Sequence, residues 1–203
     1  VLHVSDDVAG DDVALNDLAA SSGGSLLCCA LSNGAAPLYD TRSGSVLHTL
    51  TAERAAPASD SVDTSETRTH GFSSVHFMQN GSALLLTGLY GNREFKLWST
   101  IDYSLIATVT LGDAPNPSRH RLQFDPNEEF VFIASSRQAR GWAIHIKQVS
   151  NVAANSSNSG FDYICEMNTS RPILSFAAVN ALESVRNPDL EDGDRELQLF
   201  CVN

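Results

Sequence analysis

The stretch from Thr87 to Leu111 reads T-G-L-Y-G-N-R-E-F-K-L-W-S-T-I-D-Y-S-L-I-A-T-V-T-L and consists of short apolar runs joined by polar turns. The runs are rich in Leu, Ile, Val, Phe and Trp, residues that suit the half-buried surface of a pleated sheet. Gly91-Asn92 and the segment from Ser99 to Tyr103 supply turn residues between the runs. The stretch therefore predicts antiparallel strands joined by short turns.

The same arrangement recurs along the chain. Residues 13–50 and 72–111 each divide into four strand-like runs, a third repeat begins at Arg121, and a fourth begins at Pro172. The third strands of the four repeats are predicted at Leu38-Tyr39, Leu97-Trp98, Ile144-His145 and Leu197-Gln198, which are 59, 47 and 53 residues apart. A period near ~45 residues with four strands per repeat is typical of a WD40-type β-propeller, in which each four-stranded sheet is one blade.

We therefore expect an all-β fold in which residues 1–203 form a partial WD40-type β-propeller domain. The chain supplies three full blades and part of a fourth, so we expect it to belong to a larger, seven-bladed propeller. The predicted blade-like units span about residues 12–50, 71–111, 119–168 and 171–203, with an Ala- and Ser-rich loop at 51–70 and an Asn- and Ser-rich loop at 151–160.

Two Asn-Gly pairs, Asn33-Gly34 and Asn80-Gly81, fall between strand-like runs. Asn-Gly favours type I′ turns, because both central residues of such a turn need positive φ. We expect tight type I′ hairpins at both pairs.

Composition predicts a globular protein that makes no contact with a membrane. The chain is 42% apolar and 18% charged, and none of its apolar runs approaches the ~18 residues that a membrane helix needs. Cys28, Cys29, Cys165 and Cys201 all lie in apolar strand-like runs without a C-x-x-C motif. This pattern predicts reduced, packed thiols in a cytoplasmic protein.

The formal net charge of −11 is unevenly distributed. Residues 1–70 carry 10 acidic and 3 basic side chains, residues 71–150 carry 6 and 7, and residues 151–203 carry 8 and 3. A nucleic-acid-binding domain is expected to be basic over a contiguous face, so the overall balance disfavours one. A candidate binding patch is confined to the central basic residues, which are Arg93, Lys96, Arg119, Arg121, Arg137, Arg140 and Lys147. Such a patch predicts contact with an RNA backbone or an acidic peptide, and the alternative is ordinary solvated loops and strand edges.

The sequence predicts a structural set of polar residues in the second repeat. Thr87 lies eleven residues before Trp98, Asn92 lies six residues before it, and His70 stands at the entrance to the repeat. In WD40 blades such positions hold a hydrogen-bonded staple, and a buried indole N–H requires a partner. Asn92 stands where Asp is usual, which would replace a charge-assisted bond with a neutral one. The alternative is that Trp98 only packs between blades.

Motifs for catalysis are absent from the sequence. It contains no G-x-S-x-G, no phosphate-binding G-x-x-x-x-G-K-[ST], no G-x-G-x-x-G and no H-E-x-x-H. The six His residues are scattered, without further ligand types at metal spacing. We expect no catalytic residue, no metal and no cofactor; a propeller enzyme is the least favoured hypothesis.

Three short segments carry a family resemblance. T-G-L-Y-G-N-R-E-F-K-L-W-S-T at residues 87–100 resembles the T-G-x-x-x-N-R-E-x-K-x-W-x-T blade of the enhancer of mRNA-decapping protein 4 family, called Varicose in plants. Arg171-Pro-Ile-Leu-Ser-Phe176 is similar to the P-V-L-S-F strand of that family, and Leu197-Gln-Leu-Phe-Cys-Val202 to its K-L-F-C-V strand. The three matches occur in the same order and cover about residues 87–202, with only a generic blade pattern before them.

The resemblance implies the C-terminal part of the WD40 propeller of a large scaffold in cytoplasmic processing bodies. In that family the propeller is a docking platform associated with the decapping coactivator, while a separate subunit hydrolyses the mRNA cap. The resemblance therefore implies protein partners among the decapping-complex subunits and no catalytic residues. Alternative functions are the propeller of another cytoplasmic assembly, or a propeller that binds RNA directly through the central basic residues.

Overall fold

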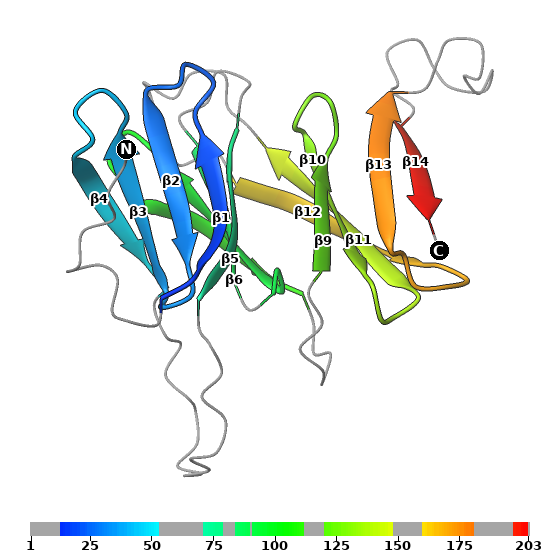
Figure 1. Ribbon diagram of the computed structural model, residues 1–203. Coiled ribbons are helices and arrows are strands. Elements are labelled where there is room, and N and C mark those ends of the chain that lie inside the picture. The colour runs from blue at the N-terminus through cyan, green and yellow to red at the C-terminus, as the bar shows by residue number, and fades with distance from the viewer. Residues whose placement is uncertain are drawn as a thin grey trace, which may run out of the picture. The chain divides into compact units, whose positions relative to one another are not determined.

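The computed structural model describes residues 13–52, 71–78, 84–89, 91–111, 120–147, 160–180 and 197–202. For residues 84, 85, 180, 197 and 198 only the backbone is described. These parts of the chain contain fourteen strands and no helix (Figure 1). The predicted all-β fold is confirmed.

Three of the four sheets are four-stranded, and each is an antiparallel meander whose strands follow the order of the sequence. The first sheet contains β1 (Leu15–Ala20), β2 (Leu26–Leu31), β3 (Ala35–Asp40) and β4 (Val46–Thr51). The second contains β5 (Phe72–Phe77), β6 (Leu84–Leu89), β7 (Glu94–Ser99) and β8 (Leu105–Thr110). The third contains β9 (His120–Phe124), β10 (Phe130–Ser135), β11 (Arg140–Lys147) and β12 (Gly160–Asn168). The last sheet has two strands, β13 (Ser175–Asn180) and β14 (Leu197–Val202).

The chain divides into two compact units, of which the first holds β1–β8 and the second holds β9–β14. In the first unit β1 lies beside β5, so the first strands of consecutive sheets are neighbours, as in a propeller. The two sheets bury a common core that includes Cys28 and Leu38 from the first sheet and Val75 and Trp98 from the second. Burial of these apolar faces is the main force that holds the two sheets together.

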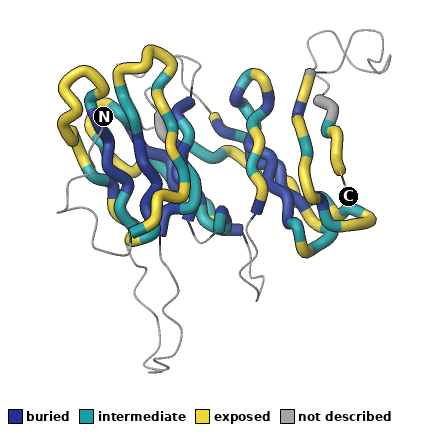
Figure 2. The backbone as a smooth tube through the Cα atoms, viewed as in Figure 1, coloured by how far each residue is buried: buried dark blue, intermediate teal, exposed yellow. Residues whose placement is uncertain are grey.

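The second unit repeats this packing on a smaller scale, with β13 beside β9. Phe132 and Ala143 of the third sheet pack against Ala178 of β13. The central strands of the four-stranded sheets are largely buried, whereas the described side chains of β14 are mostly exposed (Figure 2).

The position of β14 differs from the prediction. We expected Leu197-Gln198 to lie in the third strand of the fourth repeat, but β14 pairs directly with β13, from Ser175 opposite Val202 to Asn180 opposite Leu197. It therefore occupies the second position of its sheet. The spacing was misleading because distance along the chain does not determine which strands pair, and the segment between β13 and β14 is longer than the usual connection within a blade.

The turn at Asn33-Gly34 is a hairpin, but the predicted type I′ geometry is wrong. Gly34 has a φ of 86°, whereas Asn33 is not among the residues with positive φ. The Gly34 N–H donates to the Leu31 carbonyl at 3.3 Å, and three residues join β2 to β3. A three-residue hairpin needs only its last residue in the left-handed region, which is why glycine is required there and asparagine is not. Asn80-Gly81 lies outside the described residues.

The four cysteines are free, but only two of them are packed as predicted. Cys28 and Cys29 are buried in β2, whereas Cys165 in β12 and Cys201 in β14 are exposed. Burial raises the pKa of the Cys28 thiol, and the neighbouring Cys29 and Asp17 add to the effect. Burial likewise raises the pKa of Cys29. Both thiols of β2 are therefore held in the unreactive protonated form.

Candidate functional site

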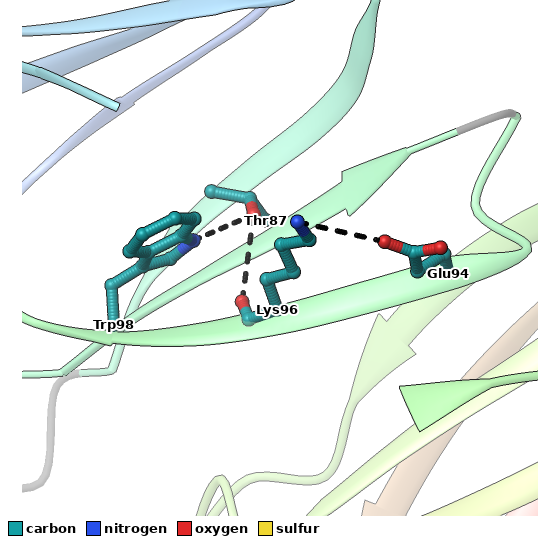
Figure 3. A network of polar contacts seen from close by, with 4 residues as sticks. All are labelled: Thr87, Glu94, Lys96 and Trp98. Atoms are coloured by element: carbon teal, nitrogen blue, oxygen red, sulfur yellow. Dashed lines mark hydrogen bonds and ion pairs between the residues drawn. The ribbon is translucent and has the colours of Figure 1, made fainter. Parts of the chain in front are cut away.

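The hydrogen bond between Trp98 and Thr87 joins β7 to β6 inside the second sheet. The Trp98 indole Nε1–H donates to Thr87 Oγ1 at 3.0 Å, and Thr87 is completely buried (Figure 3). The Thr87 hydroxyl in turn makes a long contact of 3.5 Å to the Lys96 carbonyl. The buried indole N–H thus has the partner that its desolvation requires. This pair is one half of the predicted staple.

Asn92 occupies the turn between β6 and β7 with a left-handed backbone. Gly91 and Asn92 have φ values of 70° and 65°, and the buried Asn92 Oδ1 accepts a hydrogen bond from Ser74 Oγ at 2.6 Å. Ser74 belongs to β5, so Asn92 fixes the turn to the first strand of its own sheet. Asparagine suits this position because its side chain tolerates the left-handed region better than other polar residues do.

Gly88 leaves the space that Asn92 needs. A Cβ at Gly88 would overlap Asn92 Oδ1 and lie 2.5 Å from Ser74 Oγ. The T-G-x-x-x-N spacing therefore has a steric basis: the glycine in β6 accommodates the asparagine side chain of the following turn. His70, the fourth member of the predicted staple, lies outside the described residues, so the complete set stays a prediction.

Lys96 does not belong to a surface patch, contrary to the prediction. Its side chain is only 6% exposed, its Nζ lies 3.8 Å from Glu94 Oε1, and it stands 6.0 Å from the centre of the Trp98 ring (Figure 3). Glu94, Lys96 and Trp98 alternate along β7 and therefore share one face. Because Trp98 belongs to the core between the first and second sheets, this face is covered.

The remaining predicted basic residues fall in different units. Arg93 is partly buried in the first unit, and Arg119 lies outside the described residues. Arg121, Arg137, Arg140 and Lys147 are exposed in the third sheet. The register places Arg121 opposite Ala134, near the β10–β11 turn that carries Arg137 and precedes Arg140. Lys147 lies at the other end of β11. Three arginines thus gather at one end of this sheet, and Arg140 Nε is paired with Glu166 Oε1 at 3.0 Å.

Two polar side chains of β1 bind the backbone of β5 and so join the first two sheets. These contacts were not predicted from the sequence. The Asn16 amide donates to the Phe72 carbonyl at 2.7 Å, and Asp17 Oδ2 accepts from the Val75 N–H at 3.1 Å. The available signal was the pair Asn16-Asp17 within the apolar run V-A-L-N-D-L-A. Polar residues inside a strand that borders another sheet are candidates for such side chain to backbone bonds.

An aromatic row crosses the third sheet. Phe130, His145 and Tyr163 lie on β10, β11 and β12, with ring centres 4.9 Å apart in each successive pair. His145 Nδ1 also lies 3.2 Å from Asp162 Oδ2. Asp162 is exposed and His145 is partly buried, and among the described contacts no nucleophilic hydroxyl or thiol is hydrogen-bonded to this dyad.

The described residues contain no group of three or more His, Cys, Asp or Glu side chains placed to hold a metal ion. Within the same part of the chain, no helix long and apolar enough to span a membrane is found.

The fold is similar to solved WD40 structures. Sqt1 of Saccharomyces cerevisiae matches with a TM-score of 0.57 and 16% identity, over 95% of this chain and 44% of that one. The WD40 domain of Toxoplasma gondii coronin matches with a TM-score of 0.56 and 12% identity, over 82% and 38%. A chain of the mitotic checkpoint complex matches with a TM-score of 0.54 and 16% identity, over 81% and 44%.

The chain is therefore a partial WD40-type β-propeller. It spans less than half the length of each of these structures. No protein-family profile matches the chain, and no curated protein matches its sequence.

Proposed function

We propose that this chain is a non-catalytic interaction module of an mRNA-decapping complex in cytoplasmic processing bodies. The observation that carries the proposal is the segment T-G-L-Y-G-N-R-E-F-K-L-W. The residues that it shares with the decapping scaffold family include Thr87, Gly88, Asn92 and Trp98, each of which has a defined part in the β6–β7 hairpin. A shared set of interdependent residues supports common ancestry more strongly than the same number of independent surface matches.

The two later family matches add to this support. Residues 171–176 run into β13, and residues 197–202 form β14, the strand that pairs with it. The second and third matching segments therefore meet in one sheet. A rigid sheet scaffold is suited to docking a partner peptide.

The test is capture of decapping factors by the purified chain, followed by direct titration with the purified decapping coactivator. We expect saturable binding of the coactivator. The control is the Sqt1 propeller, which has the same fold at 16% identity. Absence of binding at tens of micromolar coactivator would contradict the decapping assignment, and recovery of an unrelated complex would favour another cytoplasmic assembly.

A second candidate function is direct RNA binding. It is favoured by Arg121, Arg137 and Arg140 at one end of the third sheet, although Arg140 already pairs with Glu166. Binding through these arginines would be lost steeply as salt rises, because counterions are released from the phosphates. Filter binding of single-stranded RNA at 50 and 200 mM salt (about the range in which such contacts weaken strongly) distinguishes the two functions. An affinity that is absent, or unchanged by Arg137→Glu, removes this candidate.

A further inference from the structure

Four exposed arginines gather at one end of the third sheet. Arg137 lies in the turn between β10 and β11, and Arg140 is the first residue of β11. Arg121 on β9 lies opposite Ala134, the last residue but one of β10. Arg171 lies in the connection from β12 to β13. We call these four arginines the arginine end.

Backbone hydrogen bonds bring Arg171 to the β10–β11 turn (Figure 1). The Thr169 N–H donates to the Ala139 carbonyl at 2.9 Å, and the Ile173 N–H donates to the Ser135 carbonyl at 3.3 Å. The connection is thus attached to both ends of the turn, and Arg171 lies midway between the two attachment points. It was not part of the basic patch predicted from the sequence, because these bonds join segments that are distant along the chain.

Side-chain hydrogen bonds fix the backbone that carries the arginines. The fully buried Ser135 Oγ accepts from the N–H groups of Arg137 and Gln138 at 3.3 and 3.0 Å. The Thr169 hydroxyl donates to the Arg171 carbonyl at 2.7 Å. A backbone that is already fixed lowers the entropy lost when a ligand binds.

The described carboxylates of the second unit lie mostly at the opposite end of the third sheet. That end, in the β9–β10 turn and early in β12, holds Asp125, Glu128, Glu129 and Asp162. Only Glu166 lies at the arginine end, where it pairs with Arg140. The arginine end is therefore a local positive surface in a chain whose formal net charge is −11.

We propose that the arginine end binds an acidic peptide segment, rich in Asp and Glu, of a partner protein. A guanidinium group donates paired N–H bonds to a carboxylate, so the geometry of arginine suits this ligand better than that of lysine does. Arg137 and Arg171 come from two adjoining connections and can therefore engage neighbouring carboxylates of one segment. The proposal names a partner chemistry for the interaction module and does not depend on the decapping assignment.

RNA fits the same arginines less well. Proteins that hold single-stranded RNA combine basic side chains with exposed aromatic rings on which the bases stack. The rings nearest the arginine end are those of His120 and Trp142, which are 5% and 6% exposed and pack edge to face. The exposed ring of Tyr163 lies beside Asp162 at the other end, where a phosphate would be repelled. An acidic peptide needs no stacking surface.

The test compares two fluorescein-labelled ligands, decaglutamate and an oligouridylate of the same length, by fluorescence anisotropy with the 203-residue chain in about 0.1 M salt. We expect saturable binding of decaglutamate in the micromolar range and weaker binding of the RNA. An uncharged peptide of alternating glycine and serine, of the same length, is the ligand control and should not bind.

Paired variants localise the binding. Arg137→Glu should weaken decaglutamate binding about tenfold, because it replaces an attraction with a like-charge contact. The matched control Lys147→Glu makes the same charge change about 20 Å away along β11 and should have less than about a twofold effect. Glu166→Gln releases Arg140 and should tighten binding about threefold. Asp162→Asn removes the same charge from the other end of β12 and should leave the affinity unchanged.

Three outcomes would overturn the proposal. The first is absence of decaglutamate binding at about 1 mM by a chain whose circular dichroism is that of a folded β protein. The second is equal weakening by Arg137→Glu and Lys147→Glu, which would show a diffuse charge effect. The third is tighter binding of the RNA than of decaglutamate, lost in Arg137→Glu, which would assign the arginines to RNA. None of these ligands is a decapping factor, so failure here leaves the decapping assignment to its own test.

Discussion

The first and second sheets bury an aromatic side chain at the same position, but only one of the two side chains has a hydrogen-bond partner among the described residues. In the register of each sheet Tyr39 opposes Leu27 as Trp98 opposes Leu85, so Tyr39 occupies the position of Trp98 and Cys29 that of Thr87. The Trp98 N–H is hydrogen-bonded to Thr87. The Tyr39 hydroxyl, by contrast, is buried without a hydrogen-bond partner among the described residues, beside the apolar side chains of Cys29 and Leu31. The polar bond is therefore a local addition to the blade and not a requirement of the fold.

The largest expected effect comes from Gly88→Ala in the second sheet. The added Cβ would overlap Asn92 Oδ1 and force the β6–β7 turn away from β5, with an expected loss of about 3 kcal/mol in the free energy of unfolding. The comparison is Ala30, which holds the position of Gly88 in the first sheet and is fully buried. Ala30→Gly should cost about 1 kcal/mol. Urea denaturation measures both, and equal losses would show that Asn92 does not require the glycine.

The variants Trp98→Phe and Tyr39→Phe give the most direct comparison of the two sheets, because each removes the polar group of the aromatic side chain at the same position. Loss of the indole leaves the buried Thr87 hydroxyl without its donor and creates a small cavity, so we expect about 2 kcal/mol of destabilisation. Tyr39→Phe removes a buried hydroxyl that lacks a partner and should change stability by less than about 0.5 kcal/mol, or increase it. Similar losses in both variants would mean that Trp98 acts through volume alone.

The first sheet should also be the more sensitive to alkali. Burial raises the pKa of Cys28, of Cys29 and of Tyr39 in this sheet. Above an ordinary thiol pKa of about 8.5 the unfolded chain loses thiol protons that the folded chain retains, so folding stability falls as pH rises. One such thiol contributes a slope of up to about 1.4 kcal/mol per pH unit. Chemical denaturation between pH 8 and 10 measures the slope, which Cys28→Ala should reduce; an unchanged slope would contradict the assignment to this thiol.

The smallest effect is kinetic and leaves the fold intact. A thiol-specific disulfide reagent at pH 8 should label Cys165 and Cys201 rapidly, because both are exposed. Cys28 and Cys29 should react only after the first sheet opens, because the reactive species is the thiolate and burial suppresses it. Mass spectrometry of partly labelled protein identifies the sites. Rapid labelling of all four would show that β2 is accessible in the native protein.

The repeated meander could be predicted from sequence because most of the strands are short, largely apolar runs next to turn residues. The hydrogen bond between Thr87 and Trp98 could also be predicted from the sequence, because their spacing spans one hairpin. The burial of Lys96 could not be predicted from the sequence, because it depends on which face of β7 meets the first sheet. The position of β14 was missed for a related reason: spacing along the chain does not say which strands pair. The predicted unit boundaries stay predictions, and so does the basic patch without Lys96.

The fluorescence of the two tryptophans can also report the unfolding of each compact unit. Trp98 is buried in the first compact unit, and Trp142, the other tryptophan of the chain, is buried in the second with its ring edge against His120. Each unit thus carries a single tryptophan, whose emission shifts to longer wavelength when its own core admits water. The same Trp98→Phe protein that tests the hydrogen bond would report the melting of β9–β14 alone, so one variant shows whether the two units unfold together or one after the other.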